Sequence, residues 1–246
     1  MRPVTIHLTV VNPNTTQSMT DLVEAQARLV AGPGTVVTGR TPSMGPASIE
    51  SHYDEALAVP GLLEVIRADE QADAFVLACF GDPGLDAARE AASRPVIGIA
   101  EAAMKTASLL GRSFSVVTTM SRTVGRAWDL TRTYGLERQC AGVHACDIPV
   151  LELEEDRDRT YAVILAFAKN ALAQDGSDAV VLGCAGMAGL PELLTAELGV
   201  PVVDGVTAAT VMAEGLVRLG LRPSTQGELA PPPPKAYTGI LAPFGR

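Results

Sequence analysis

The chain has 246 residues, of which 47% are hydrophobic and 19% charged, and its formal net charge is −9. These values exclude a disordered chain, and the length allows one large domain or two of roughly 100–130 residues. The acidic balance argues against a nucleic-acid surface, because no cluster of Lys and Arg side chains could neutralise a row of phosphates. No run of about 18 apolar residues is present, so we expect no transmembrane helix and no membrane partner.

The N-terminal segment predicts a strand rather than a targeting signal. Residues 4–11 are strand-like but are followed at once by Asn-Pro-Asn at 12–14, so the apolar segment is too short for a signal peptide. We therefore expect a cytoplasmic protein. The four cysteines form no C-x-x-C pair, which supports neither a zinc ribbon nor a thioredoxin-type site, and in a reducing compartment they would be free thiols.

Strands and helices alternate along the first half of the chain. We predict strands at 6–11, 35–38, 73–79 and 95–98, and helices from Thr15 or Thr16 to about Val30, at 49–58 and at 61–70. A loop rich in Gly, Pro and Ser, residues 41–48, precedes the helix at 49–58. This alternation is typical of parallel sheets covered by helices.

The second half restarts the same order. We predict strands at 114–119, within 143–150, at 178–184 and at 201–204, and helices at 121–134, 156–174 and 207–220. The tail with Pro231–Pro234 is expected to be an extended surface segment.

Two segments of the chain are nearly the same. Residues 73–81 read Asp-Ala-Phe-Val-Leu-Ala-Cys-Phe-Gly, and residues 178–186 read Asp-Ala-Val-Val-Leu-Gly-Cys-Ala-Gly. Each is an apolar strand that ends on a cysteine, with a glycine soon after. The duplication predicts an α/β protein of two pseudo-symmetric lobes, each a mostly parallel flavodoxin-like sheet covered by helices, with the active site in the cleft between them. We predict a discontinuous first lobe at 1–97 plus 205–246, because the last helix packs back on it, and a second lobe at 98–204.

The two repeated cysteines are the candidate catalytic residues. A single cysteine at the end of a buried strand is usually structural. Two thiols at equivalent positions, Cys79 and Cys184, instead indicate a catalytic pair, and we expect a helix start after each to lower its pKa. Cys140 and Cys146 have no counterparts in the repeat and are interpreted as structural.

Further candidates lie at the carboxyl ends of the strands, where open α/β sheets bind ligands. The backbone N–H groups of Gly81 and Gly186 either stabilise a developing oxyanion or serve only the turns. Some polar side chains either contact the ligand or merely cap helices and turns: Asn14, Ser48, Thr118 and Thr119. His52 is predicted to be a surface residue within a helix. No nucleotide-binding motif is present.

Five segments carry a family resemblance. They are Asn-Pro-Asn-Thr-Thr at 12–16, Gly-Pro-Ala-Ser-Ile-Glu at 45–50, Ala-Cys-Phe-Gly-Asp-Pro-Gly-Leu at 78–85, Pro-Val-Ile-Gly-Ile-Ala-Glu-Ala-Ala at 95–103 and Gly-Cys-Ala-Gly-Met at 183–187. At these residues the chain resembles the hydantoin and allantoin racemase group of the aspartate/glutamate racemase superfamily. The resemblance implies racemisation by Cys79 and Cys184 with no metal or pyridoxal phosphate, and a homo-oligomer.

The residues after the cysteines depart from the superfamily's amino-acid racemases, which typically have Asn-Thr after the first and Thr with an acid–base residue after the second. Here Phe80 and Ala185 follow, and neither offers a partner for an ammonium or a carboxylate. A neutral ring held by backbone amides and an apolar wall from Phe80 suits such a site better. We favour 5-monosubstituted hydantoins, and the sequence leaves open allantoin, which is 5-ureidohydantoin, and a small-diacid isomerase or decarboxylase.

Overall fold

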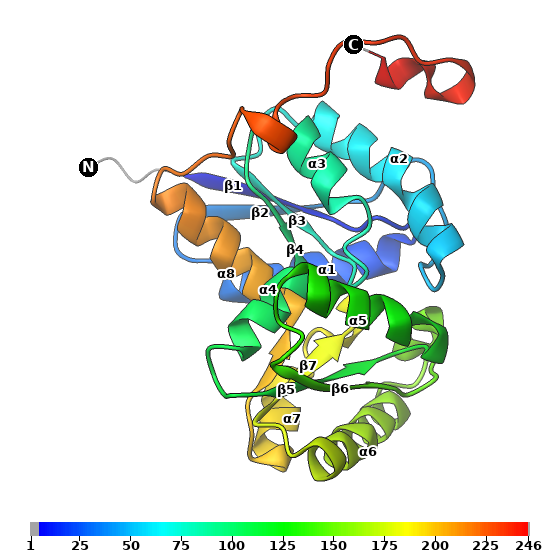
Figure 1. Ribbon diagram of the computed structural model, residues 1–246, viewed down its shortest axis with the longest axis vertical. Coiled ribbons are helices and arrows are strands. Elements are labelled where there is room, and N and C mark those ends of the chain that lie inside the picture. The colour runs from blue at the N-terminus through cyan, green and yellow to red at the C-terminus, as the bar shows by residue number, and fades with distance from the viewer. Residues whose placement is uncertain (1–4, 246) are drawn as a thin grey trace.

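The computed structural model describes residues 5–245, which form two α/β halves (Figure 1). The first half contains β1 (Ile6–Val11), α1 (Gln17–Val30), β2 (Thr35–Arg40), α2 (His52–Ala68), β3 (Ala74–Leu77), α3 (Leu85–Ala91), β4 (Val96–Gly98) and α4 (Ile99–Ala107). The second contains β5 (Phe114–Thr118), α5 (Val124–Thr133), β6 (Cys140–Ala145), α6 (Arg157–Asp175), β7 (Ala179–Gly183), α7 (Pro191–Leu198), β8 (Val202–Asp204) and α8 (Gly205–Arg218). Short 3₁₀ turns are η1 (Ser121–Thr123), η2 (Val150–Glu154), η3 (Ala185–Met187), η4 (Gly227–Leu229) and η5 (Gly239–Phe244).

The strands form two four-stranded sheets with equivalent strand orders. The first sheet has the order β2-β1-β3-β4 and the second the order β6-β5-β7-β8, and all paired strands run parallel. The predicted α/β architecture of two pseudo-symmetric halves is therefore confirmed.

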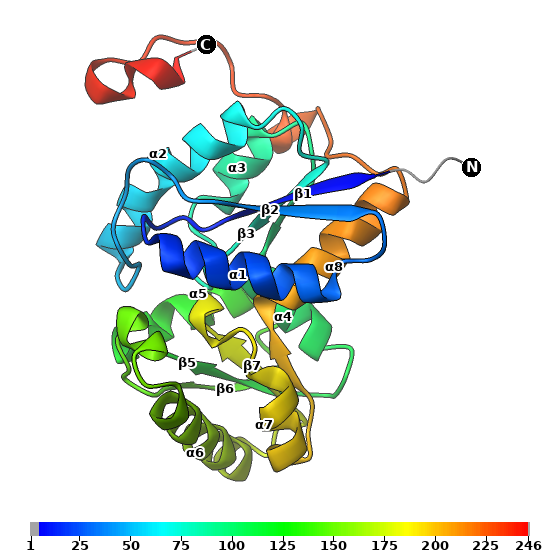
Figure 2. The ribbon, with the colours of Figure 1, turned by 180° about the vertical axis from the view of Figure 1, so that it is seen from behind.

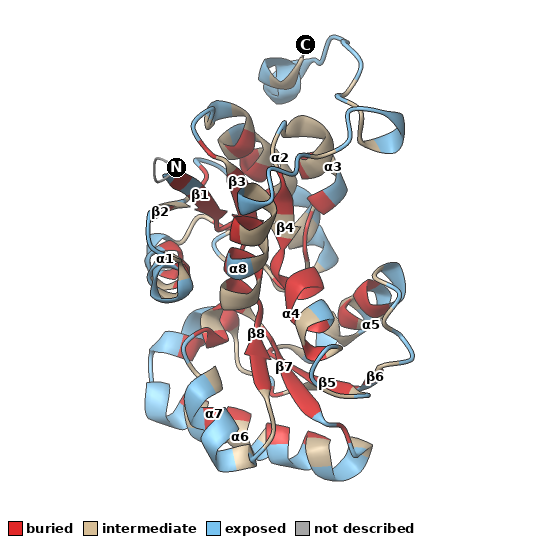
Figure 3. Cartoon of the chain, turned by 90° about the vertical axis from the view of Figure 1, so that its left-hand side faces the viewer, coloured by how far each residue is buried: buried red, intermediate tan, exposed pale blue. Residues whose placement is uncertain are grey.

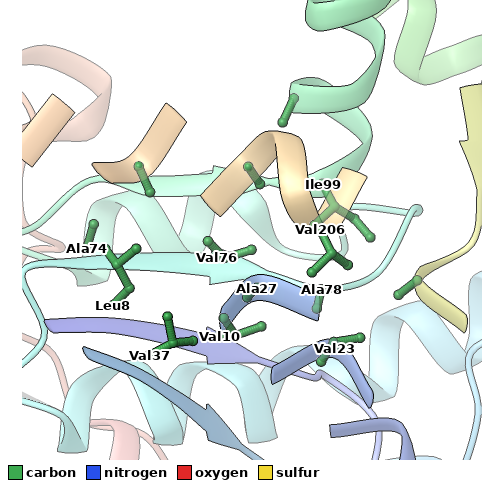
Figure 4. Packing of buried hydrophobic residues seen from close by; sticks show 14 of the residues in the cluster. Leu8, Val10, Val23, Ala27, Val37, Ala74, Val76, Ala78, Ile99 and Val206 are labelled. Atoms are coloured by element: carbon green, nitrogen blue, oxygen red, sulfur yellow. The ribbon is translucent and has the colours of Figure 1, made fainter. Parts of the chain in front are cut away.

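Each sheet is covered by helices on both faces, which explains why its strands are almost continuously apolar. In the first sheet, Leu8, Val10 and Val76 point to the α1 and α8 side (Figure 4), whereas Phe75 and Leu77 point to α2 and α3. This split follows from the two-residue period of a strand. The second sheet is covered in the same way, by α4 and α5 on one face and by α6 and α7 on the other. Figure 3 shows the buried strands between helices with exposed outer surfaces.

The last helix of each half crosses to the other half. Helix α4 follows β4 of the first sheet but packs on β7 and β8, and α8 follows β8 of the second sheet but packs on β1, β3 and β4. The two helices pack on each other where the halves meet (Figures 1 and 2). The lobe boundaries at residues 97 and 204 stay a prediction. Within residues 5–245, every helix falls short of the length or apolar character that a membrane span requires.

Helix α2 differs from the sequence expectation. Two helices, 49–58 and 61–70, were expected, but one helix runs through Pro60. It begins at His52 because the Ser51 hydroxyl accepts a hydrogen bond from the N–H of Asp54 at 3.2 Å. A Cβ on Gly61 would lie 2.2 Å from the carbonyl oxygen of Met44, so the 41–48 loop packs directly against the helix beside the proline. This packing accompanies an interior proline that local propensity disfavours.

The crossing of α4 and α8 predicts a stability difference between two glycines of α8. A Cβ on Gly205 would lie 2.3 Å from the carbonyl oxygen of Ile99, whereas one on Gly215 meets nothing within 4 Å. Gly205→Ala should lower the free energy of unfolding by about 1–3 kcal/mol, because backbone must move. Gly215→Ala should raise it by about 0.5–1 kcal/mol through helix propensity. Urea denaturation measures both, and equal effects would contradict a tight crossing.

Candidate active site

Both repeated cysteines line one pocket between the two halves. The pocket lies at the carboxyl ends of β3 and β7 and receives residues from both sheets. It is lined by most of the sequence-predicted site residues: Asn14, Cys79, Phe80, Gly81, Thr118, Thr119, Cys184 and Ala185. Ser48 and Gly186 are not among the lining residues. Residues that follow β1, β3, β5 and β7 thus meet at one pocket, although this does not by itself assign a role to any side chain.

The two cysteines have equivalent local geometry. The N–H of Asp82 donates to the carbonyl of Cys79 at 2.9 Å, and the N–H of Met187 donates to the carbonyl of Cys184 at 3.1 Å. Each cysteine is therefore the first residue of a tight turn at the end of a buried strand. Cys140 and Cys146, by contrast, are buried in the hydrophobic clusters on the two faces of the second sheet.

The thiol environment contradicts the expected lowering of the pKa. Burial raises the pKa of the Cys79 thiol far above its ordinary value and that of Cys184 to about 11. No regular helix begins at either sulfur: α3 starts only at Leu85, and Cys184 is followed by a three-residue 3₁₀ turn. The N–H groups of Gly81 and Gly186 act on the two sulfurs and offset part of the burial effect. Their role toward a ligand oxygen stays a prediction.

The residue after each cysteine packs into the opposite half. Phe80 joins the cluster of α4, α5 and the second sheet, while Ala185 joins the cluster of α1, α8 and the first sheet. Phe80 still lines the pocket, with 7% of its surface exposed, so it serves both as core residue and as apolar wall.

Some polar side chains that line the pocket already have hydrogen-bond partners within the protein, and others do not. The Asn14 amide is held within its own turn, because its oxygen accepts from the N–H of Thr16 and its nitrogen lies 3.3 Å from the Met19 sulfur. The Thr118 hydroxyl donates to the carbonyl of Gly183 at 3.0 Å. Within residues 5–245 no hydrogen-bond partner is found for the Thr119 hydroxyl, which makes it the better candidate to contact a ligand.

Sequence reasoning missed two charged residues in the pocket wall, Glu55 of α2 and Arg126 of α5. Arg126 donates to the carbonyl of Gly81 through Nε at 3.1 Å and Nη2 at 2.7 Å, and its Nε lies 3.3 Å from Oε2 of Glu55. No local pattern marks this pair, because the two side chains come from helices of different halves. His52, one turn before Glu55, has an exposed side chain, as the sequence predicts.

A protein-family model described as Asp/Glu/Hydantoin racemase matches residues 8–213. This chain belongs to the Asp/Glu/hydantoin racemase family. The racemase is 48% identical to a hydantoin racemase from Rhizobium meliloti, over 95% of this chain and 98% of that protein. It is 44% identical to a hydantoin racemase from Pseudomonas sp. (strain NS671), over 96% of each chain. A solved allantoin racemase from Klebsiella pneumoniae superposes with a TM-score of 0.95 and 48% identity, covering 98% of this chain and 99% of that one.

The raised thiol pKa of this racemase predicts a steep pH dependence of alkylation. Well below its pKa, a thiol gains about tenfold in thiolate for each pH unit. Iodoacetamide should therefore modify Cys184 about ten times faster at pH 9 than at pH 8, and again about ten times faster at pH 8 than at pH 7. Peptide mapping by mass spectrometry gives the rate at each cysteine, with Cys184→Ser as the control for peak assignment. A rate that levels off below pH 9 would contradict the buried, protonated thiol.

Proposed function

We propose that this racemase acts on 5-monosubstituted hydantoins and moves the C5 proton between Cys79 and Cys184 without a cofactor. One observation carries the proposal: two thiols at equivalent turns of the two halves line a single pocket. Inverting a carbon requires a base on one face and an acid on the other, and a duplicated site supplies one thiol for each. The hydantoin racemase relatives support the choice of ring.

The reaction balances with the two thiols alone. The C5 hydrogen lies beside a carbonyl, so its transfer to one thiolate leaves an enolate-like anion on the ring. The opposite thiol then donates its proton to the other face of C5, which gives the mirror-image ring and a new thiolate. The two sulfurs have then exchanged protonation states, and proton exchange with water restores the starting form. Their titrations are coupled because charge on Cys184 raises the pKa of Cys79.

Burial of the thiols fits a weak carbon acid. A thiolate whose conjugate acid has a raised pKa is a stronger base, and proton abstraction becomes more favourable as the pKa of the base approaches that of the carbon acid. The cost is a low thiolate population in the free protein at neutral pH, which the N–H groups of Gly81 and Gly186 partly offset.

Backbone N–H groups near Gly81 and Gly186 would stabilise the enolate oxygen together with a side-chain donor. Thr119 is our candidate, because its hydroxyl faces the pocket without a protein partner among residues 5–245. One such donor can contribute about 3–4 kcal/mol to stabilising the transition state.

Allantoin is the principal alternative substrate. It carries the same ring and the same C5 chemistry, and the similar allantoin racemase from Klebsiella pneumoniae supports it. A small-diacid isomerase or decarboxylase remains a weaker alternative, because the paired thiols match racemisation better. The cytoplasmic location and the homo-oligomer stay predictions.

Replacing either thiol should abolish racemisation. Cys79→Ser and Cys184→Ser should each lose racemisation of both enantiomers, because a hydroxyl is too weak an acid to form the required base. Each variant should still exchange the C5 hydrogen for solvent deuterium in the one enantiomer whose proton faces the surviving thiol. Polarimetry and proton NMR in D₂O measure the two activities on L- and D-5-benzylhydantoin and on allantoin.

Cys140→Ser is the matched control, because that thiol lies in a hydrophobic cluster outside the pocket lining. A Cys184→Ser protein that racemises at nearly the wild-type rate would refute the two-thiol mechanism.

A further inference from the structure

The ion pair of Glu55 and Arg126 has no part in the proton transfer described above. Both side chains line the pocket, and they are 16% and 29% exposed. Burial raises the pKa of Glu55, an effect that Arg126 partly counteracts. A partly buried ion pair in a substrate pocket is costly unless its remaining hydrogen-bonding groups are satisfied, and the pocket holds the space where a ligand could satisfy them.

The pair leaves both a donor and an acceptor free. Arg126 uses Nε and Nη2 for the Gly81 carbonyl, and Nε and Oε2 join the two side chains. The described residues, 5–245, place no acceptor on Nη1 of Arg126 and no donor on Oε1 of Glu55. A carboxylate oxygen beside a guanidinium N–H is complementary to a group that presents an N–H beside a C=O.

The pair also has a defined position relative to the thiols. A Cβ on Gly81 would lie 2.3 Å from Oε1 of Glu55, so the carboxylate sits over the turn that begins at Cys79. Arg126 is fixed to the same turn, because it donates to the carbonyl of Gly81. The pair therefore forms the pocket wall beside Cys79. A C5 carbon held next to the Cys79 sulfur would carry its substituent along this wall.

We propose that Glu55 and Arg126 form the subsite for the C5 substituent and select a ureido-type group over an alkyl or aryl group. The inference rests on the proposed function and narrows it to hydantoins with a polar substituent. A ureido group replaces the water on both charged side chains by direct hydrogen bonds. An isopropyl or benzyl group removes that water and returns no hydrogen bond, which leaves the charges unsatisfied.

The test compares two substrates in four proteins. We expect the wild type to favour allantoin over 5-isopropylhydantoin by at least about tenfold in kcat/KM, since a site built for hydrogen bonds discriminates against a ligand that lacks them. Glu55→Leu should reduce this preference at least about tenfold, mainly through the KM of allantoin. Glu55→Gln, which keeps an acceptor oxygen, should retain more of the preference than Glu55→Leu. Glu64→Leu is the matched control on the exposed side of α2 and should leave the preference unchanged.

The outcomes separate the inference from the proposed function. A wild type that racemises both hydantoins without preference would overturn the inference and leave the function standing. An equal loss for both substrates in Glu55→Leu, with normal thermal unfolding, would also overturn it, because the pair would then bind the ring or position Cys79. If Glu55→Leu fails to fold, Glu55→Gln decides: a partial loss of the preference, through a raised KM for allantoin, supports the inference, and an unchanged preference or equal losses for both substrates overturn it. A wild type that racemises neither hydantoin overturns the proposed function and the inference together.

Discussion

In each half of the molecule, the residue after the cysteine packs in the hydrophobic core of the other half. Phe80 is buried against α4 and α5, and Ala185 is buried against α1 and α8. Each thiol is therefore fixed at the boundary by its own neighbour, and neither turn can shift without opening a cavity in the opposite core. The position of both cysteines in one pocket and the burial of their sulfurs depend on this packing of each neighbour into the opposite half.

The turn after Cys79 has additional polar restraints. Asp82 adopts a left-handed conformation (φ 44°), and its carboxylate accepts hydrogen bonds from the Tyr134 hydroxyl at 2.5 Å and from the N–H groups of Ala100 and Glu101. Burial raises the pKa of this carboxyl to about 6 in spite of those bonds. A strained residue held by three donors, one of them from the residue that follows α5, is typical of a functional loop. The same enclosure that orients Cys79 also makes its thiolate costly, so precise placement and easy ionisation oppose each other here.

The sequence predicts what depends on local pattern and on the repeat. Parallel strands buried on both faces read as apolar runs, and the duplicated segment places Cys79 and Cys184 at equivalent turns. The sequence predicts two helices around Pro60 where the structure has one. The contact that accompanies the continuous helix, Gly61 against Met44, joins segments that are distant in the sequence and leave no local signal. The predicted lowering of the thiol pKa values is wrong, because burial raises them and no regular helix starts at either sulfur. Glu55 and Arg126 were missed because their contact exists only once α2 and α5 meet across the boundary.

The crossing of α4 and α8 limits how such a molecule could have originated. A polypeptide with only one of the two repeats would carry a terminal helix that has no sheet of its own to cover, and it would leave part of one sheet face bare. Two identical copies would solve both problems by exchanging these helices about a twofold axis. Such a form would be a domain-swapped homodimer in which each chain contributes one thiol to a symmetric cavity.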